Sequence, residues 1–165
     1  MEAQNNNISV LFVCLGNICR SPMAEGAFAK AAADAGLDIR VASAGTAGYH
    51  IGEAPDPRAI EAARANGVDI SGALGQQLAD SDFTDFTHIF ALDAANMAGI
   101  KARAPRYKTA HLAMLLDAVD GRKGDAVHDP YYGDERDFED CWAVVNEAAN
   151  ALVARFKVDG ANARF

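Results

Sequence analysis

The stretch ISVLFVCLGNICRSPMAE, residues 8–25, runs from apolar residues through a short loop to the start of a helix. Its first part is rich in β-branched and aromatic residues, which favours a buried strand. Pro22 suits the first position of a helix, and we expect Ser21 to cap that helix. Gly16 permits a positive φ angle in the loop, and Asn17 tolerates one. The stretch therefore predicts a strand, a tight loop and a helix in direct succession.

A cysteine and an arginine enclose this loop, Cys14 at its start and Arg20 at its end. A loop between a strand and a helix N-terminus directs backbone N–H groups and the positive end of the helix dipole at one point, where an anion can bind. A thiol at that point is favoured as thiolate, and the planar guanidinium of Arg20 can bind two phosphate oxygens. A lone cysteine at a strand end is usually only a small apolar residue, but the residues around Cys14 favour phosphoryl transfer to its sulfur.

The composition limits the class of protein. The chain has 165 residues, of which 50% are hydrophobic, and a formal net charge of -8. This length predicts one domain over residues 1–165, with residues 1–7 and 157–165 as flexible tails. The acidic balance argues against a nucleic-acid partner, because phosphate backbones attract a basic surface. The sequence predicts no membrane span, and the polar N-terminus does not resemble a secretory signal. We therefore expect a cytoplasmic protein.

The three cysteines are Cys14, Cys19 and Cys141, an odd and small number that is typical of a reducing compartment. The four histidines form no paired ligand spacing with Cys14 and Cys19, so we predict neither a zinc site nor a metal requirement. Cys141 falls on the apolar face of a predicted helix, where a core position is expected.

Predicted strands and helices alternate along the chain. The expected strands lie at residues 8–13, 39–43, 86–92 and 107–110. The expected helices lie at residues 22–35, 57–66, 94–103, 111–117 and 138–156. This order predicts an α/β fold of three layers, in which helices flank both faces of a four-stranded parallel sheet. Ligands of such sheets bind beyond the carboxyl ends of the strands, where Cys14 is expected to lie.

The spacing from Cys14 to Ser21 resembles the C-x5-R-S signature of protein tyrosine phosphatases, and residues 11–25 are similar to its low-molecular-weight branch. Three further segments are similar to that family: Ser43-Ala44-Gly45-Thr46 to its second-strand loop, residues 52–59 to the segment before its second helix, and Asp129-Pro130-Tyr131-Tyr132-Gly133 to its general-acid loop. The resemblance spans about residues 8–156. It implies a flavodoxin-like fold of the phosphotyrosine phosphatase I type.

The resemblance implies a role for each matching catalytic residue. Cys14 would attack phosphorus and form a phosphocysteine. Arg20 would bind the phosphate and stabilise its equatorial oxygens in the transition state. Asp129 would protonate the phenolic leaving oxygen and then activate water. An Asp-Pro pair is also common at the start of a turn, and that reading of Asp129 would hold if it stood alone.

Other matching residues would support these three. Backbone amides along the loop would complete the phosphate cradle, at Leu15, Gly16, Asn17, Ile18, Cys19 and Arg20. Ser21 would hydrogen-bond the thiolate and favour it as a leaving group. Asn17 would hold the loop in shape, with Ser43 as its partner.

The loops around the cradle suggest a substrate and a means of regulation. Tyr49, Tyr131 and Tyr132 stand where the family has aromatic walls around an aryl phosphate; ordinary surface packing is the alternative. Cys19 lies five residues from Cys14, and members of the family are regulated by a disulfide between such cysteines. A small buried residue is an equally good interpretation of Cys19. Gln76 stands where the family often has arginine, so we expect a compensating contact near residues 70–83.

The strongest alternative is an arsenate reductase of the same fold, which needs a further redox pair near residues 75–95. This chain has no cysteine there. A non-catalytic phosphate-binding module is a second alternative, although the presence of both Cys14 and Asp129 argues against it. We therefore predict a low-molecular-weight protein-tyrosine-phosphatase (EC 3.1.3.48) without a cofactor. Its expected partners are phosphotyrosine-containing proteins, with inorganic phosphate and other oxyanions as inhibitors, and we expect a monomer or a weak dimer.

Overall fold

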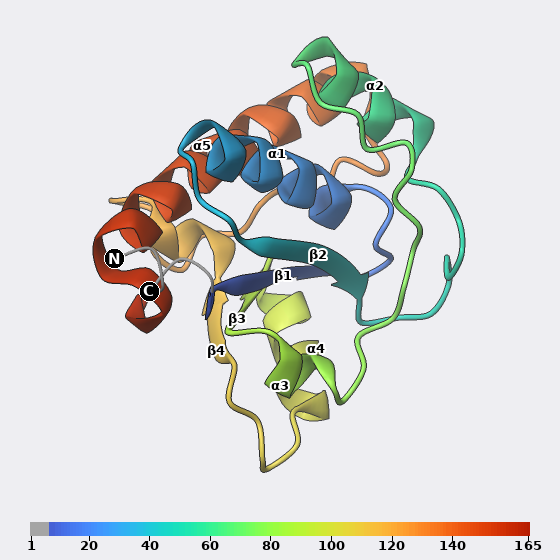
Figure 1. Ribbon diagram of the computed structural model, residues 1–165. Helices are drawn as coiled ribbons and strands as arrows, with labels where there is room; N and C mark the ends of the chain where they lie inside the picture. Colours follow the sequence, from blue (N-terminus) through green and yellow to red (C-terminus); the bar gives the residue numbers. More distant parts are fainter. Residues whose placement is uncertain (1–6) are drawn as a thin grey trace.

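Four parallel strands form the single sheet of the computed structural model, which describes residues 7–165 (Figure 1). The strands are β1 (Ser9–Cys14), β2 (Arg40–Gly45), β3 (His88–Ala91) and β4 (His111–Met114), in the spatial order β2-β1-β3-β4. The register pairs Val10 with Val41 on one side and with His88 on the other. The predicted α/β fold with a four-stranded parallel sheet is thus confirmed. Residues 1–6 of the predicted N-terminal tail lie outside the described residues.

Helices cover both faces of this sheet and make the three predicted layers (Figure 1). One face carries α1 (Arg20–Asp34), α2 (Pro57–Ala65) and α5 (Glu135–Asp159). The other face carries α3 (Asp82–Asp85) and α4 (Ala94–Arg103). Two short 3₁₀ helices complete the elements, η2 (Leu115–Ala118) and η3 (Gly160–Asn162). Within residues 7–165, no helix has the length and apolar character needed to cross a membrane.

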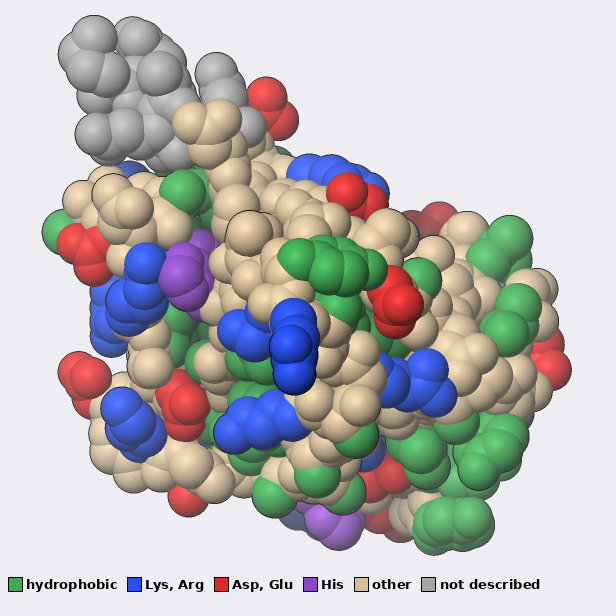
Figure 2. Space-filling view, turned by 90° about the horizontal axis from the view of Figure 1, so that it is seen from below, with side chains coloured by type: hydrophobic (Ala, Val, Ile, Leu, Met, Phe, Trp, Pro, Cys, Tyr) green, Lys and Arg blue, Asp and Glu red, His purple; other side chains and the backbone are tan. Residues whose placement is uncertain are grey.

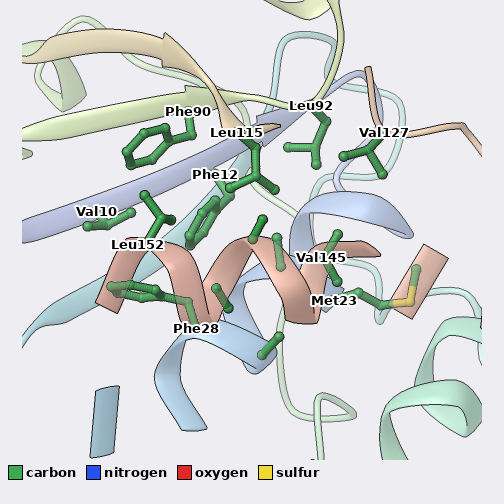
Figure 3. Packing of buried hydrophobic residues seen from close by; sticks show 14 of the residues in the cluster. Val10, Phe12, Met23, Phe28, Phe90, Leu92, Leu115, Val127, Val145 and Leu152 are labelled. Atoms are coloured by element: carbon green, nitrogen blue, oxygen red, sulfur yellow. The ribbon is translucent and has the colours of Figure 1, made fainter. Parts of the chain in front are cut away.

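The central strand β1 is buried along its whole length, which explains its continuous apolar sequence. Successive side chains of a strand point to opposite faces. Val10 and Phe12 join the core beneath α1 and α5, whereas Leu11 and Val13 join the core beneath α4. Figure 3 shows Phe12 among its neighbours, and its ring centroid lies 5.7 Å from that of Phe28 and 5.9 Å from that of Phe90. Packing on both faces fixes the carboxyl end of β1, where Cys14 lies.

The fourth strand and the helix after it differ from the prediction. The predicted strand at 107–110 is wrong, because β4 begins at His111, whose N–H donates to the Thr87 carbonyl. The helix predicted at 111–117 is replaced by β4 and the 3₁₀ helix η2. The short helix α3 was not predicted. Residues 107–116 contain no glycine or proline to mark a boundary, so pairing with β3 decides where this strand begins.

The C-terminal segment also differs from the prediction of a flexible tail over 157–165. Helix α5 continues to Asp159 and ends at Gly160, which has a φ of 61°. Ala163 is buried, and its carbonyl accepts a hydrogen bond from His88 Nε2 at 2.9 Å. The ring of Phe165 packs 5.3 Å from that of Phe90. The chain end therefore closes the core at the start of β3.

His88 makes stability depend on pH. Burial, the largest effect, lowers the pKa of His88 to about 4. Above about pH 6.5 the imidazole is neutral in both the folded and the unfolded chain. As the pH falls toward 4, only the unfolded chain takes up this proton, so the free energy of unfolding decreases by at most about 1.4 kcal/mol per pH unit.

We expect His88→Gln to remove this part of the pH dependence, because glutamine does not titrate. Urea unfolding between pH 4 and pH 7 measures the slope, with the exposed His128 changed to Gln as a control. A slope in His88→Gln equal to that of the unchanged protein would contradict the assignment.

Candidate active site

A cavity of about 230 Å³ opens at the carboxyl end of β1. Its lining residues come from the loop after β1, from the loop after β2 and from the segment before α5: Cys14, Leu15, Gly16, Ile18, Cys19, Arg20, Tyr49, His50, Asp129, Tyr131 and Tyr132. The three residues expected to be catalytic and the three expected wall tyrosines thus share one cavity. Asn17, Ser21 and Ser43 lie behind it, in the hydrogen-bond network that supports the loop.

Asn17 holds the loop in its shape. It is the only non-glycine residue in the described part of the chain with a positive φ, at 60°. Its Nδ2 donates to Ser21 Oγ at 2.8 Å and to Ser43 Oγ at 3.0 Å, as expected for Ser43. Gly16 permits a positive φ but does not adopt one. A Cβ atom at Gly16 would instead come within 3.1 Å of His50 Cδ2, so the glycine allows the His50 side chain to pack closely against the loop.

The polar network continues away from the loop. Asn17 Oδ1 accepts a hydrogen bond from the Gln76 N–H at 2.9 Å, and Gln76 Nε2 donates to the Ser43 carbonyl at 2.9 Å. Gln76 thus bonds the loop after β1 and strand β2, within the segment 70–83 where a compensating contact was expected. Ser43 Oγ in turn donates to Glu25 Oε1 at 2.6 Å, and burial raises the pKa of Glu25. The buried polar groups of this network are therefore matched donor to acceptor.

Ser21 does not cap helix α1, and that prediction is wrong. The helix begins at Arg20, and Cys19 occupies the capping position without a side-chain hydrogen bond. The Ser21 hydroxyl lies 3.0 Å from Cys14 Sγ. Since Ser21 Oγ already accepts a hydrogen bond from Asn17, its own hydrogen is free to point at the sulfur. Ser21 can thus stabilise a thiolate at Cys14.

The charge of Arg20 is buried and tightly held. Arg20 Nη1 donates to Asp93 Oδ2 at 2.7 Å and to the Val127 carbonyl at 2.9 Å. Burial opposes the charged guanidinium, but the hydrogen bond to Asp93, with the nearby charges, raises the pKa of Arg20 above its ordinary value. Asp93 Oδ1 accepts from the Asn96 N–H at 2.7 Å and so caps α4. The second role of Asp93, fixing Arg20, was not predicted from the sequence.

Asp129 combines a turn with a position at the mouth of the cavity. Its Oδ1 accepts a hydrogen bond from the Tyr131 N–H at 3.1 Å, which is the turn expected of an Asp-Pro pair. Its Oδ2 lies 3.6 Å from Arg20 Nη2, and the side chain is 47% exposed. The structure therefore shows the turn expected of Asp129 and places its carboxylate beside Arg20.

Arg58 anchors the loop that carries Asp129. Its Nη1 donates to the Gly133 carbonyl and its Nη2 to the Tyr131 carbonyl, each at 3.0 Å. The carboxylate of Asp56 orients the guanidinium, with Oδ1 3.1 Å from Nε and Oδ2 2.9 Å from Nη2. The Asp56 N–H donates to the Ile18 carbonyl at 2.8 Å. The ion pair of Asp56 and Arg58 is therefore also connected to the loop after β1. The sequence resemblance included these residues but assigned them no role.

The tyrosines differ in exposure. Tyr131 is 38% exposed and packs edge-on against Tyr132, with ring centroids 4.9 Å apart. Tyr132 and Tyr49 are 94% and 71% exposed and form the outer rim of the cavity. Cys19 is buried, and burial followed by the charge of Asp56 raises the pKa of its thiol. Burial raises the pKa of Cys141 to about 12, in agreement with its expected place in the core.

Comparisons with known proteins agree with this geometry. The family model "Low molecular weight phosphotyrosine protein phosphatase" matches residues 9–162. A Schizosaccharomyces pombe phosphatase of that name is 42% identical, over 82% of this chain and 88% of the relative. A solved Entamoeba histolytica protein tyrosine phosphatase has a TM-score of 0.86 at 32% identity, covering 92% of this chain and 97% of that one. The solved arginine phosphatase YwlE has a TM-score of 0.84 at 28% identity, covering 92% and 97%. The chain belongs to the low molecular weight phosphotyrosine protein phosphatase family.

Arg58→Ala tests the anchoring of the Asp129 loop. We expect kcat/KM for phenyl phosphate to fall about tenfold, because a poor leaving group needs a well-placed proton donor. The loss for para-nitrophenyl phosphate is expected to be smaller, since its leaving group needs less protonation. Arg64→Ala, on the same helix and paired only with Glu61 among the described residues, serves as the control. Equal losses for the two substrates would contradict a role through Asp129.

Proposed function

We propose that this protein hydrolyses phosphotyrosine and other aryl phosphate monoesters through a phosphocysteine on Cys14 (EC 3.1.3.48). The observation that carries the proposal is that Cys14, Arg20 and Asp129 line one cavity, with the Ser21 hydroxyl 3.0 Å from the sulfur. Such a cavity joins a nucleophile, a fixed positive charge and a proton donor around a space for one phosphate. Both steps of the reaction use only these groups and water.

In the first step the Cys14 thiolate attacks phosphorus, and the bond between phosphorus and the aryl oxygen breaks. Arg20 and the backbone amides of the loop bind the equatorial oxygens, on which the charge of the transition state is spread. Asp129, as the carboxylic acid, transfers its proton to the departing phenolic oxygen. The products of this step are the free phenol and the phosphocysteine.

In the second step the Asp129 carboxylate accepts a proton from water, whose oxygen attacks phosphorus. The bond between sulfur and phosphorus breaks, and the Cys14 thiolate leaves. The hydroxyl of Ser21 stabilises the negative charge on sulfur, which makes the thiolate a better leaving group. Phosphate then dissociates, and Asp129 is again the acid.

The walls of the cavity favour a neutral aromatic group over a guanidinium. Leu15, Ile18 and the tyrosines offer apolar and aromatic surface on which a phenyl ring can pack. Within the described part of the chain, Asp129 is the one carboxylate that lines this cavity. We therefore propose phosphotyrosine rather than phosphoarginine as the substrate. A phosphotyrosine peptide and a phosphoarginine peptide of the same sequence, assayed side by side, test this choice.

The proposal extends to the biological setting. The partners are proteins that carry phosphotyrosine, and inorganic phosphate and related oxyanions compete for the cradle as inhibitors. Residues 1–165 act as one domain without a cofactor, in the cytoplasm, as a monomer or as a weak dimer through the exposed aromatic rim. The exposure of Tyr49 and Tyr132 supports the last point.

Hydrolysis of para-nitrophenyl phosphate in excess chelator tests the nucleophile. We expect the unchanged protein to turn over and folded Cys14→Ser to be inactive, because a serine hydroxyl in this cradle is a far weaker nucleophile than a thiolate. Circular dichroism of both proteins controls for folding. Equal turnover by the two proteins would rule out Cys14 as the nucleophile.

Asp129→Ala tests the proton donor separately. For phenyl phosphate we expect kcat/KM to fall by about 10²–10⁴-fold, the usual contribution of general acid catalysis. For para-nitrophenyl phosphate the loss shrinks, since the leaving group departs without full protonation. A variant as fast as the unchanged protein on phenyl phosphate would remove Asp129 from the mechanism.

A further inference from the structure

A second cavity, of about 450 Å³, lies at the end of the sheet opposite the active site. His88 and His111, the first residues of β3 and β4, are part of its wall, whereas Cys14 is the last residue of β1. Because the strands are parallel, the two cavities occupy opposite ends of the sheet. They share no lining residue.

The wall of this cavity is basic although the chain as a whole is acidic. Lys101 comes from the last turn of α4, Lys108 from the segment before β4, His111 from β4 and Arg164 from the chain end. Among residues 7–165, no Asp or Glu side chain contributes to the wall. Figure 2 looks onto the face that carries α4 and the segment after it, and lysine and arginine side chains gather there. This local excess of positive charge contrasts with the net charge of -8.

In the described part of the chain, the fold does not use these cations in ion pairs. Across residues 7–165, none of the side chains of Lys101, Lys108, His111 and Arg164 takes part in an ion pair. Among the described residues, the guanidinium of Arg164 donates only to the carbonyls of Asn162 and Ala163. The charges therefore remain available to an anion.

The pKa of His111 is affected by the positive charges around it. Burial, and then the charges of Arg164 and Lys108, lower the pKa of His111. The ring of His111 lies 5.3 Å from that of His88, which forms the buried side of the cavity. An anion bound among these groups would offset their repulsion and raise the pKa of His111. The same ring can therefore serve as a local probe of binding.

We propose that this cavity binds a small polyanion that carries a chain of phosphates. Its volume is that of a small-molecule site, too confined for a folded partner. Positive charges from separate segments suit several phosphate groups better than one, since each lysine binds as a point charge. Leu112 and Phe165 add apolar surface beside the cations, on which an organic group can pack. Inorganic polyphosphate and a nucleoside triphosphate share this chemistry.

Nuclear magnetic resonance of the His111 ring tests the proposal directly. Inorganic tripolyphosphate and ATP are titrated separately into the full chain, without divalent metal and at low salt. We expect each to shift the ring signal saturably and to raise the pKa of His111. Tighter binding of ATP identifies the nucleoside as part of the ligand, whereas equal binding assigns the affinity to the phosphate chain; both results support the site.

A double variant and a matched control complete the experiment. In Lys101→Ala with Lys108→Ala, we expect the dissociation constant measured at His111 to weaken about tenfold or more, since both point charges are lost. Lys157→Ala, an exposed lysine of α5 outside the cavity, should bind as the unchanged protein does. No saturable shift at His111, or equal affinity in the double variant, would overturn the proposal. Because binding is read without turnover, this result is independent of the proposed phosphatase activity, and hydrolysis by the variants reports that they are folded.

Discussion

The buried charge of Arg20 is the constraint on which the site depends. A guanidinium withdrawn from water costs several kcal/mol unless its donors are matched, so its partners must be fixed in place. Asp93 and the Val127 carbonyl meet this need from positions 73 and 107 residues further along the chain. The loop after β1 must therefore lie close to the end of β3, the start of α4 and the segment before Asp129. The hydrogen bonds of Arg20 thus connect the loop after β1 to the start of α4 and to the segment before Asp129.

The nucleophile is positioned by neutral hydrogen bonds instead. Asn17 takes a left-handed conformation because its amide bonds Ser21, Ser43 and the Gln76 backbone at once. These bonds leave the Ser21 hydroxyl directed at Cys14. Charged pairs thus fix Arg20 and the loop that carries Asp129, whereas uncharged hydrogen-bonding groups hold the loop that carries Cys14.

The local parts of the site could be predicted from sequence, and the distant contacts could not. The strand, loop and helix around Cys14 follow from neighbouring residues, and the apolar run of β1 follows from burial on both faces. Asp129 was found by resemblance, since an Asp-Pro pair alone predicts only a turn. The bond from Arg20 to Asp93 and the bond from Arg58 to the Gly133 carbonyl depend on which distant segments meet in space. The chain end was misjudged for the same reason: Phe165 is ordered by Phe90, a residue with no periodic relation to it.

The two ends of the sheet use positive charge in opposite ways. At the carboxyl end, Arg20 and Arg58 are held by Asp93 and Asp56, which fixes their geometry and leaves part of each guanidinium to act on substrate or loop. At the other end, the last turn of α4 carries Lys101 beside the negative end of the helix dipole, which offsets only a part of its charge. Placing several cations around one cavity does not improve the solubility of a protein whose net charge is -8. Their placement around one cavity, and their lack of ion pairs within residues 7–165, are the features expected where charge serves a ligand rather than the fold.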